Sequence, residues 1–322
     1  MSEDRAGPVL ALLGPTACGK SDLAVEVALV LAGRGSPGEV VTVDSAQLYR
    51  GMDVGTATPT PTERRGVPHH LLDVLDPAEP ADVALVQRLA REAVRDVLGR
   101  GGVPLVVGGS GLYARAVLDD LELPPTDPTV RTRLEAEVAE VGSPALHARL
   151  ARVDPAAAAA VLPTNDRRVV RALEVVELTG RPFAASLPRD PRPVFADVRV
   201  LLTRPLAEID ARVEARVDAM LGGGLVEEVR HLADAHGLRE GVTARRAVGY
   251  AQVLRHLDGE LSLDEVRAQV VVATRRLARR QLRWFRRDPS LVVLEARADA
   301  PVTADDVLAV LDARHPRPLR RG

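Results

Sequence analysis

The feature that most constrains this chain is an octapeptide near its N-terminus, Gly14-Pro15-Thr16-Ala17-Cys18-Gly19-Lys20-Ser21, which matches the phosphate-loop pattern G-x-x-x-x-G-K-S. The apolar run Val9 to Leu13 enters it, and residues 21–31 have helical spacing. This context matters because the loop N–H groups and the N-terminus of the following helix bind phosphate together. Lys20 would place its charge on a terminal phosphate, and the Ser21 hydroxyl would hold Mg²⁺. The sequence therefore predicts a phosphate site after a buried first strand.

The use of basic residues supports this interpretation. Lys20 is the only lysine in the chain, and every other cationic side chain of this type is arginine. Lysine is a compact point charge suited to a glycine-rich phosphate loop, whereas arginine suffices for general surface charge. A chance match at a turn is the alternative, but it would not explain the flanking strand and helix patterns.

Composition limits the class of protein. Hydrophobic residues make up 46% of the 322 residues and charged residues 27%, as in ordinary globular chains. One cysteine excludes a disulfide framework, and no apolar run is long enough to span a bilayer. The formal net charge of -2 argues against a uniformly basic nucleic-acid binder, although residues 266–287 hold eight arginines and no carboxylate. We expect a cytoplasmic monomer.

The order of patterns along the chain predicts an α/β fold. Strands are expected at 9–13, 39–44, 103–107, 198–202 and 291–294, and core helices at 21–31, 81–98, 206–221, 226–235, 263–287 and 304–311. Residues 45–70 have no sustained period and are expected to be an irregular functional segment. Between 119 and 187 all patterns are helical: 130–141, 143–152, 155–162 and 167–178. We therefore predict a P-loop NTPase-like parallel sheet core (1–118 and 197–316) with an inserted all-helical domain (119–196), followed by a disordered tail (317–322).

Asp44 ends the predicted second strand, at the edge where parallel sheets place their ligands. Its carboxylate could help to hold Mg²⁺ or act as a general base. A cap on the next helix, together with Ser45, is the structural alternative.

Seven segments of the chain resemble the tRNA dimethylallyltransferase family. They are the phosphate loop, residues 44–57 (DSAQLYRGMDVGTA), 67–73 (VPHHLLD), 108–113 (GGSGLY), 165–175 (NDRRVVRALEV), 248–250 (VGY) and 279–286 (RRQLRWFR). They follow the family's order from about residue 9 to about 287, and the second segment is highly specific. Departures are Cys18, Ser21, Ser110 and Thr58, of which only Thr58 loses a charge where the family usually has lysine.

The resemblance implies transfer of a dimethylallyl group from dimethylallyl diphosphate to the N6 amine of the adenine just 3′ of the anticodon in tRNA. The loop would then hold a diphosphate leaving group with Mg²⁺, and Thr16 would help to bind it. Asp44 matches the general base. Arg212 and Arg216, one helical turn apart, fit the arginines that clamp the diphosphate, and ion pairs with Glu208 and Glu214 are their structural alternative.

The resemblance also implies contacts with the anticodon stem-loop. The residues carried over are Asp44, Ser45, Ala46, Gln47, Ser110, Arg167, Arg168, Val169, Val170, Arg171, Arg246, Ala247, Val248, Gly249, Tyr250 and Ala251. The arginine-rich segment adds Arg279, Arg280 and Arg283 as a backbone-binding face, since no acids are interleaved in it. The target adenine must leave its stack to reach Asp44, which implies a channel.

Two other functions remain open from the sequence. A small-molecule or nucleotide kinase would use ATP at the same loop, and a P-loop RNA-binding protein would turn over neither donor. The arginine-rich segment disfavours a plain kinase. His69 and His70 stand apart from other ligand types, so we expect a structural role for them.

Overall fold

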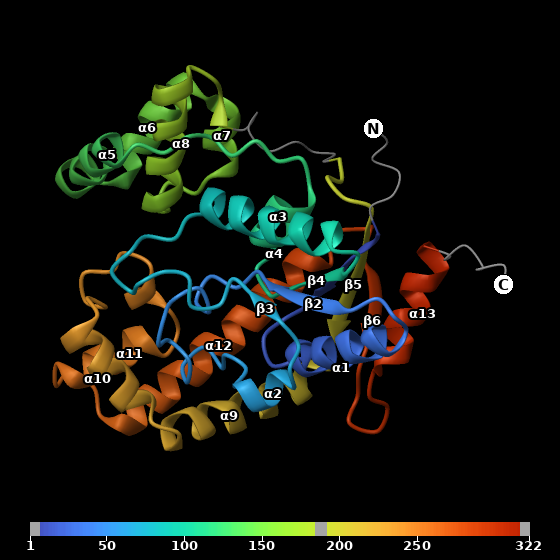
Figure 1. Cartoon of the computed structure of the whole chain (residues 1–322). Coiled ribbons are helices and arrows are strands. Elements are labelled where there is room, and N and C mark those ends of the chain that lie inside the picture. The colour runs from blue at the N-terminus through green and yellow to red at the C-terminus, as the bar shows by residue number, and fades with distance from the viewer. Residues whose placement is uncertain (1–6, 184–191, 316–322) are drawn as a thin grey trace. The chain divides into compact units, whose positions relative to one another are not determined.

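The computed structural model describes residues 7–183 and 192–315. The chain divides into two compact units, one formed by the segments up to Leu118 and from Pro193 onward and the other by Asp119–Arg192. Figure 1 shows the helices and strands of both units. The predicted tail at 317–322 lies outside the described residues.

A six-stranded sheet forms the centre of the first unit, and all its pairings are parallel. In chain order the strands are β1 (Val9–Leu13), β2 (Gly38–Thr42), β3 (His69–His70), β4 (Val103–Gly108), β5 (Asp197–Thr203) and β6 (Val292–Glu295). Their spatial order is β3-β2-β4-β1-β5-β6, so β1 lies inside the sheet between β4 and β5. The predicted parallel α/β fold is therefore confirmed.

Helices cover both faces of this sheet. They are α1 (Lys20–Gly33), α2 (Pro61–Arg64), α3 (Val83–Gly99), α4 (Gly111–Leu118), α9 (Leu206–Gly222), α10 (Leu225–Ala235), α11 (Tyr250–Leu257), α12 (Leu263–Phe285) and α13 (Ala304–Arg314). Side chains of β1 alternate between two cores: Val9, Ala11 and Leu13 pack with α3, α4 and α9–α12, whereas Leu10 and Leu12 pack with α1 and α13. A strand buried on both faces must be apolar throughout, which explains the run Val9–Leu13.

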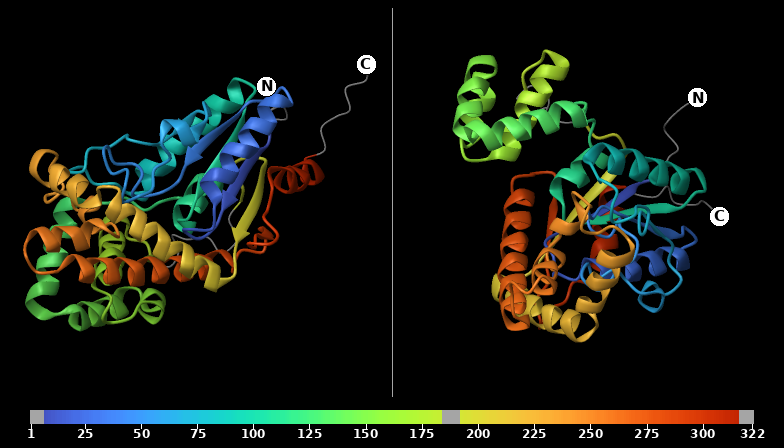
Figure 2. Two further views of the ribbon diagram at one scale, coloured as in Figure 1. Left: turned by 90° about the horizontal axis from the view of Figure 1, so that it is seen from below. Right: turned by 90° about the vertical axis from the view of Figure 1, so that its left-hand side faces the viewer.

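The long helix α12 is the element that brings distant sequence to the site. Ser262 and Glu265 form a capping box that fixes its start. It packs against α9, and the left view of Figure 2 shows the two helices side by side. This packing places residues near 281 beside a loop of residues 14–21.

The second unit contains α5 (Pro128–Val141), α6 (Ser143–Val153), α7 (Pro155–Ala160) and α8 (Asp166–Thr179) around its own core. Glu174 of α8 is fully buried there and accepts hydrogen bonds from Arg131, Arg171 and the Asp127 N–H. Burial alone would raise the pKa of Glu174, but these donors outweigh it and lower the pKa. The carboxylate therefore stays charged and joins the start of α5 to α8.

Three expectations need correction. β2 ends at Thr42, so Asp44 lies in the following turn and not in the strand. The segment 45–70 contains the short helix α2 and the edge strand β3. Helix α11 was not expected, because the Gly249-Tyr250 segment resembled a turn.

Candidate active site

The phosphate loop connects β1 to α1 in a conformation that its sequence favours. Gly19 has φ 100° and precedes α1 without a side-chain cap, so the first N–H groups of the helix are not used by a capping side chain. A Cβ at Gly14 would lie 2.2 Å from the Leu202 carbonyl oxygen, which excludes other residues there. Ala17 also adopts positive φ, at 63°. The resulting turn exposes backbone N–H groups as phosphate donors.

Three cationic side chains surround this loop. Lys20 Nζ donates to the Pro15 carbonyl oxygen at 2.8 Å, and Arg212 Nε donates to that of Ala17 at 2.8 Å. Arg216 Nη1 donates to Thr16 Oγ1 at 3.2 Å. Burial and the neighbouring Arg212 lower the pKa of Arg216. Neutral partners leave all three charges available to an anion, which would also relieve the repulsion between the arginines.

The alternative of an ion-paired surface around Arg212 and Arg216 is wrong. Glu208 pairs with Arg204 at 3.0 Å, and Glu214 pairs with Arg275. Both acids thus have other partners, and the two arginines face the phosphate loop.

Two cavities adjoin at this loop. The first, of about 110 Å³, is lined by the phosphate loop together with Asp22, Asp44, His69, Arg212 and Arg216. The second, of about 480 Å³, is lined by α9, α12 and the segments 44–46, 109–112 and 246–248. The residues that line both are Thr16, Asp44, Thr56, Gly109, Arg216 and Gln281. Asp44 is therefore close to the phosphate loop and also faces a space large enough for a nucleobase.

The Asp44 side chain is oriented by its own turn. Its Oδ1 accepts from the Ala46 N–H at 2.9 Å, and Oδ2 has no hydrogen-bond partner among residues 7–183 and 192–315. No helix begins at this turn, so the helix-cap alternative is wrong. One carboxylate oxygen thus remains free to accept a proton or to bind a cation.

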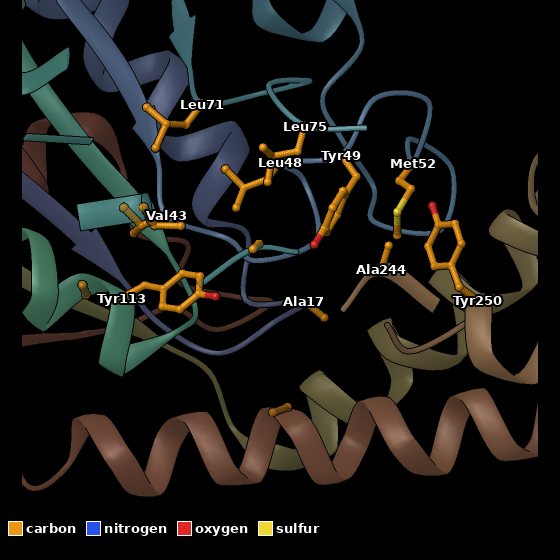
Figure 3. Close-up of a cluster of buried hydrophobic side chains, with 14 of the residues drawn as sticks. Ala17, Val43, Leu48, Tyr49, Met52, Leu71, Leu75, Tyr113, Ala244 and Tyr250 are labelled. Atoms are coloured by element: carbon orange, nitrogen blue, oxygen red, sulfur yellow. The ribbon is translucent and has the colours of Figure 1, made fainter. Parts of the chain in front are cut away.

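Two residues that shape the second cavity were missed at the sequence level. Glu228 of α10 accepts from the N–H groups of Asp53, Val54 and Gly55 at 3.0, 2.7 and 3.2 Å. It also accepts from the Tyr250 hydroxyl at 2.5 Å. Figure 3 shows Tyr250 beside Met52 at the edge of the cluster that includes Ala17. Glu228 lies about 175 residues after these amides in the chain, so no local sequence pattern reveals the pairing.

Gln281 of α12 is the other missed residue. Its Oε1 accepts from the Thr16 N–H at 2.8 Å. The segment 279–286 drew attention for its arginines, and a glutamine among them gave no signal of a contact 265 positions away.

The predicted tRNA-contacting residues of the first unit fall into two groups. Ser45, Ala46, Ser110 and the segment 246–248 line the second cavity. Gln47 donates to the carbonyl oxygens of Thr56 and Ala57, Gly249 precedes α11, and Ala251 lies in its first turn. Tyr250 is fully buried, so its side chain serves the core and not a surface.

The predicted contacts of the second unit divide similarly. Arg167 and Arg168 are exposed at the start of α8. Val169 and Val170 are buried in the core of that unit. Arg171 donates to Glu174 and to the carbonyl oxygens of Pro124 and Pro125, so its donors hold the chain entering α5.

The arginine-rich helix α12 is partly neutralised, contrary to expectation. Acids of α9 pair with three of its arginines: Asp218 with Arg267, Glu214 with Arg275 and Asp210 with Arg279. Within the described chain, Arg276, Arg280, Arg283, Arg286 and Arg287 are exposed and form no ion pair. Arg280 lines the second cavity.

The two histidines of β3 have separate roles. His70 Nε2 lies 2.7 Å from Glu39 Oε2, and His69 Nδ1 lies 2.9 Å from the Val67 carbonyl oxygen. Burial lowers the pKa of His69. No cluster of three acidic, histidine or cysteine ligands occurs in the part of the chain that is described.

The fold and site define a parallel α/β protein in which a loop with the phosphate-loop sequence lies beside a carboxylate and a larger cavity. The family model for IPP transferase matches residues 47–288. The chain is 61% identical over 292 residues to a tRNA dimethylallyltransferase of Kineococcus radiotolerans, covering 90% of this chain and 91% of that one. It is 57% identical over 303 residues to one of Thermobifida fusca, covering 94% of each.

A solved structure agrees. The full-length tRNA isopentenylpyrophosphate transferase of Bacillus halodurans is 37% identical with a TM-score of 0.66, over 95% of this chain and 94% of that one. This chain belongs to the IPP transferase family. None of the helices among the described residues is long and apolar enough to cross a membrane.

Proposed function

We propose that this protein transfers a dimethylallyl group from dimethylallyl diphosphate to the N6 amine of the adenine just 3′ of the anticodon in tRNA. The observation that carries the proposal is that Thr16 and Asp44 line both cavities, so a diphosphate in one can meet a nucleobase in the other. The names of the relatives support the same activity. A tRNA substrate also supports a cytoplasmic protein.

The first cavity suits the leaving group. Breaking the allylic C–O bond moves negative charge onto diphosphate oxygens and leaves a delocalised allyl cation. Lys20, Arg212 and Arg216 surround the phosphate loop, so they stabilise this charge as it develops. Their preorganisation is what lowers the barrier, because no side chain needs to be recruited during the reaction.

The junction of the cavities suits the nucleophile. The N6 nitrogen forms the new N–C bond, and Asp44 Oδ2 accepts the proton that N6 loses. The Ala46 N–H holds Oδ1 and so fixes the direction of the base. An adenine stacked in an anticodon loop must unstack to enter, and the 480 Å³ cavity has room for it.

The residues present fit Mg²⁺. The Ser21 hydroxyl and the carboxylate of Asp22 line the first cavity and are the oxygen ligands that Mg²⁺ prefers. Mg²⁺ usually keeps several water and phosphate oxygens in its coordination shell, so it needs only a few ligands from the protein. When bound, Mg²⁺ would neutralise charge on the diphosphate.

For the tRNA backbone we propose the exposed arginines Arg280 and Arg283 of α12 in the first unit, and Arg167 and Arg168 in the helical unit. Each can pair with phosphate without first losing an acidic partner in the described chain.

One assay tests the function. Unmodified tRNA is incubated with Mg²⁺ and dimethylallyl diphosphate, digested, and searched by mass for prenylated adenosine. Asp44→Asn should lower transfer by about 10²- to 10⁴-fold while tRNA affinity is retained. A parallel reaction with labelled ATP tests the kinase alternative: phosphate transfer without prenylation would refute our proposal.

A further inference from the structure

Gln281 occupies the place where the two cavities meet, although it comes from the far end of the chain. Its Oε1 accepts from the Thr16 N–H at 2.8 Å, and its side chain lines both cavities. Helix α12, which carries Gln281, is held against the rest of the unit by its packing on α9. A rigid helix thus holds one amide of the phosphate loop.

The contact with Thr16 fixes which way the amide of Gln281 points. A backbone N–H can only donate, so the atom that faces it must be the carbonyl oxygen. The Nε2 group therefore lies on the other side, above Gly109, where an added Cβ would come within 2.5 Å of it. Among residues 7–183 and 192–315, Nε2 has no acceptor. Its N–H groups are unused donors at the junction.

The charges nearby indicate what these donors meet. Lys20, Arg212 and Arg216 surround the adjacent loop, so the substrate group held there is an anion. A neutral amide donor adds a directional hydrogen bond to such an anion without adding further positive charge.

We propose that Gln281 binds the diphosphate directly: Oε1 holds Thr16 in place and Nε2 donates to a diphosphate oxygen. This inference rests on the proposed function, since it takes the anion to be the leaving group of the transfer.

Two substitutions separate the two roles. Gln281→Met keeps the length of the side chain and removes both hydrogen bonds. Gln281→Glu keeps an acceptor for the Thr16 N–H, but it replaces the donor with a negative charge. Gln269→Met is the matched control, because Gln269 lies on the same helix and only accepts from Arg255 at 3.3 Å on the exposed side.

The readouts are calorimetric affinity for inorganic pyrophosphate, kcat, KM for dimethylallyl diphosphate and for tRNA, and Tm. We expect Gln281→Met to weaken pyrophosphate binding by about 10- to 100-fold, with KM for tRNA unchanged. Gln281→Glu should weaken it further, and Gln269→Met should match the wild type. A purely structural role predicts the reverse order, because glutamate still holds Thr16.

Three results would overturn the inference: pyrophosphate affinity unchanged in Gln281→Met, tighter binding by Gln281→Glu than by Gln281→Met, or a rise confined to KM for tRNA. Failure of the proposed function looks different. The wild type would then transfer no prenyl group, while pyrophosphate binding and its loss in the variants would still support the role of Gln281.

Discussion

A single carboxylate, that of Glu228, holds the backbone of residues 53–55, a loop that borders the second cavity. It satisfies three consecutive amides and a buried hydroxyl, and the ring of Tyr250 in turn leaves no room for a Cβ at Gly55, which would lie 2.5 Å away. Gly55 and Thr56 of this loop line the second cavity. The shape of the cavity wall at Gly55 and Thr56 thus depends on a residue of α10 that does not line the cavity.

Glu228→Gln should destabilise the protein by about 1–3 kcal/mol, because the amide accepts fewer hydrogen bonds and brings a donor against N–H groups. Urea unfolding measures this. Glu227→Gln, at the exposed neighbouring position, is the control and should unfold as the wild type does. Equal stability of the two variants would contradict the role assigned to Glu228.

The ion pair of Glu39 with Arg100 should make the stability of the fold depend on pH. Glu39 is only 5% exposed, and Arg100 lowers its pKa through a hydrogen-bonded ion pair, aided by His70 and opposed by burial. Because its pKa in the folded protein lies below the usual 4.5, this pair stabilises the fold above that pH and is lost as the pH falls through the lowered value. Glu39→Gln should cost about 2 kcal/mol at neutral pH.

The test is urea unfolding of the wild type and Glu39→Gln across the acid range. The difference between them should be constant at neutral pH and shrink as the solution is acidified below about pH 4.5. A difference that stays the same at every pH would show that the charge on Glu39 contributes nothing.

At the scale of elements, α9 divides the arginines of α12 into two sets. The guanidinium of Arg279 forms an ion pair with Asp210, whereas Arg283 is exposed and has no acidic partner in the described chain. We expect Arg283→Gln to weaken tRNA binding and to reduce the slope of log affinity against log salt by about 0.7–0.9. Arg279→Gln should leave that slope unchanged and lower stability only slightly, because the ion pair with Asp210 is open to solvent.

Fluorescence anisotropy with labelled tRNA across a KCl series distinguishes the two variants. An equal loss of slope in both would mean that the Asp210 pair opens when RNA binds, and that α9 does not divide the helix as described.

The elements with clear periodicity were predicted closely. The apolar spacing of α3 and α12 placed their ends within a few residues, and the predicted strand at 103–107 became Val103–Gly108. The same local logic could not find α11, whose buried Tyr250 and Val253 follow a glycine and two arginines that resemble a turn. It also placed Asp44 in a strand, because β-branched residues continue to Val43 while the ladder ends at Thr42.

The sequence predicted only those parts of the site whose residues are contiguous in the chain. The phosphate loop and its Lys20 depend on contiguous residues, so the motif alone located them. Gln281 and Glu228 act on loops that lie far away in the chain, and their partners are backbone amides, which leave no trace in the sequence. Such contacts follow from how α10 and α12 pack, and packing is a property of the whole fold.

For the molecule as a whole, the decisive fact is that its two units have separate hydrophobic cores. Leu134, Leu150 and Leu173 belong to a cluster formed within 119–192, and both sheet cores lie outside that range. The chain leaves and re-enters the first unit at one place, since the Val194 N–H donates to the Leu118 carbonyl oxygen at 2.8 Å. Residues 119–192 can therefore be replaced by a short linker without straining the sheet.

Such a deletion, joined by about four Gly and Ser residues, should give a folded protein that still binds inorganic pyrophosphate, because every residue of the first cavity is retained. Its affinity for tRNA should fall by about tenfold or more, since Arg167 and Arg168 are removed. Arg167→Gln with Arg168→Gln in the full-length chain is the companion variant, and it should reproduce part of that loss without changing pyrophosphate binding. Calorimetry and anisotropy measure the two affinities. A deletion variant that unfolds would show that the helical unit contributes to the stability of the sheet domain. A folded variant that binds tRNA as tightly as the full chain would show that the helical unit contributes nothing to recognition.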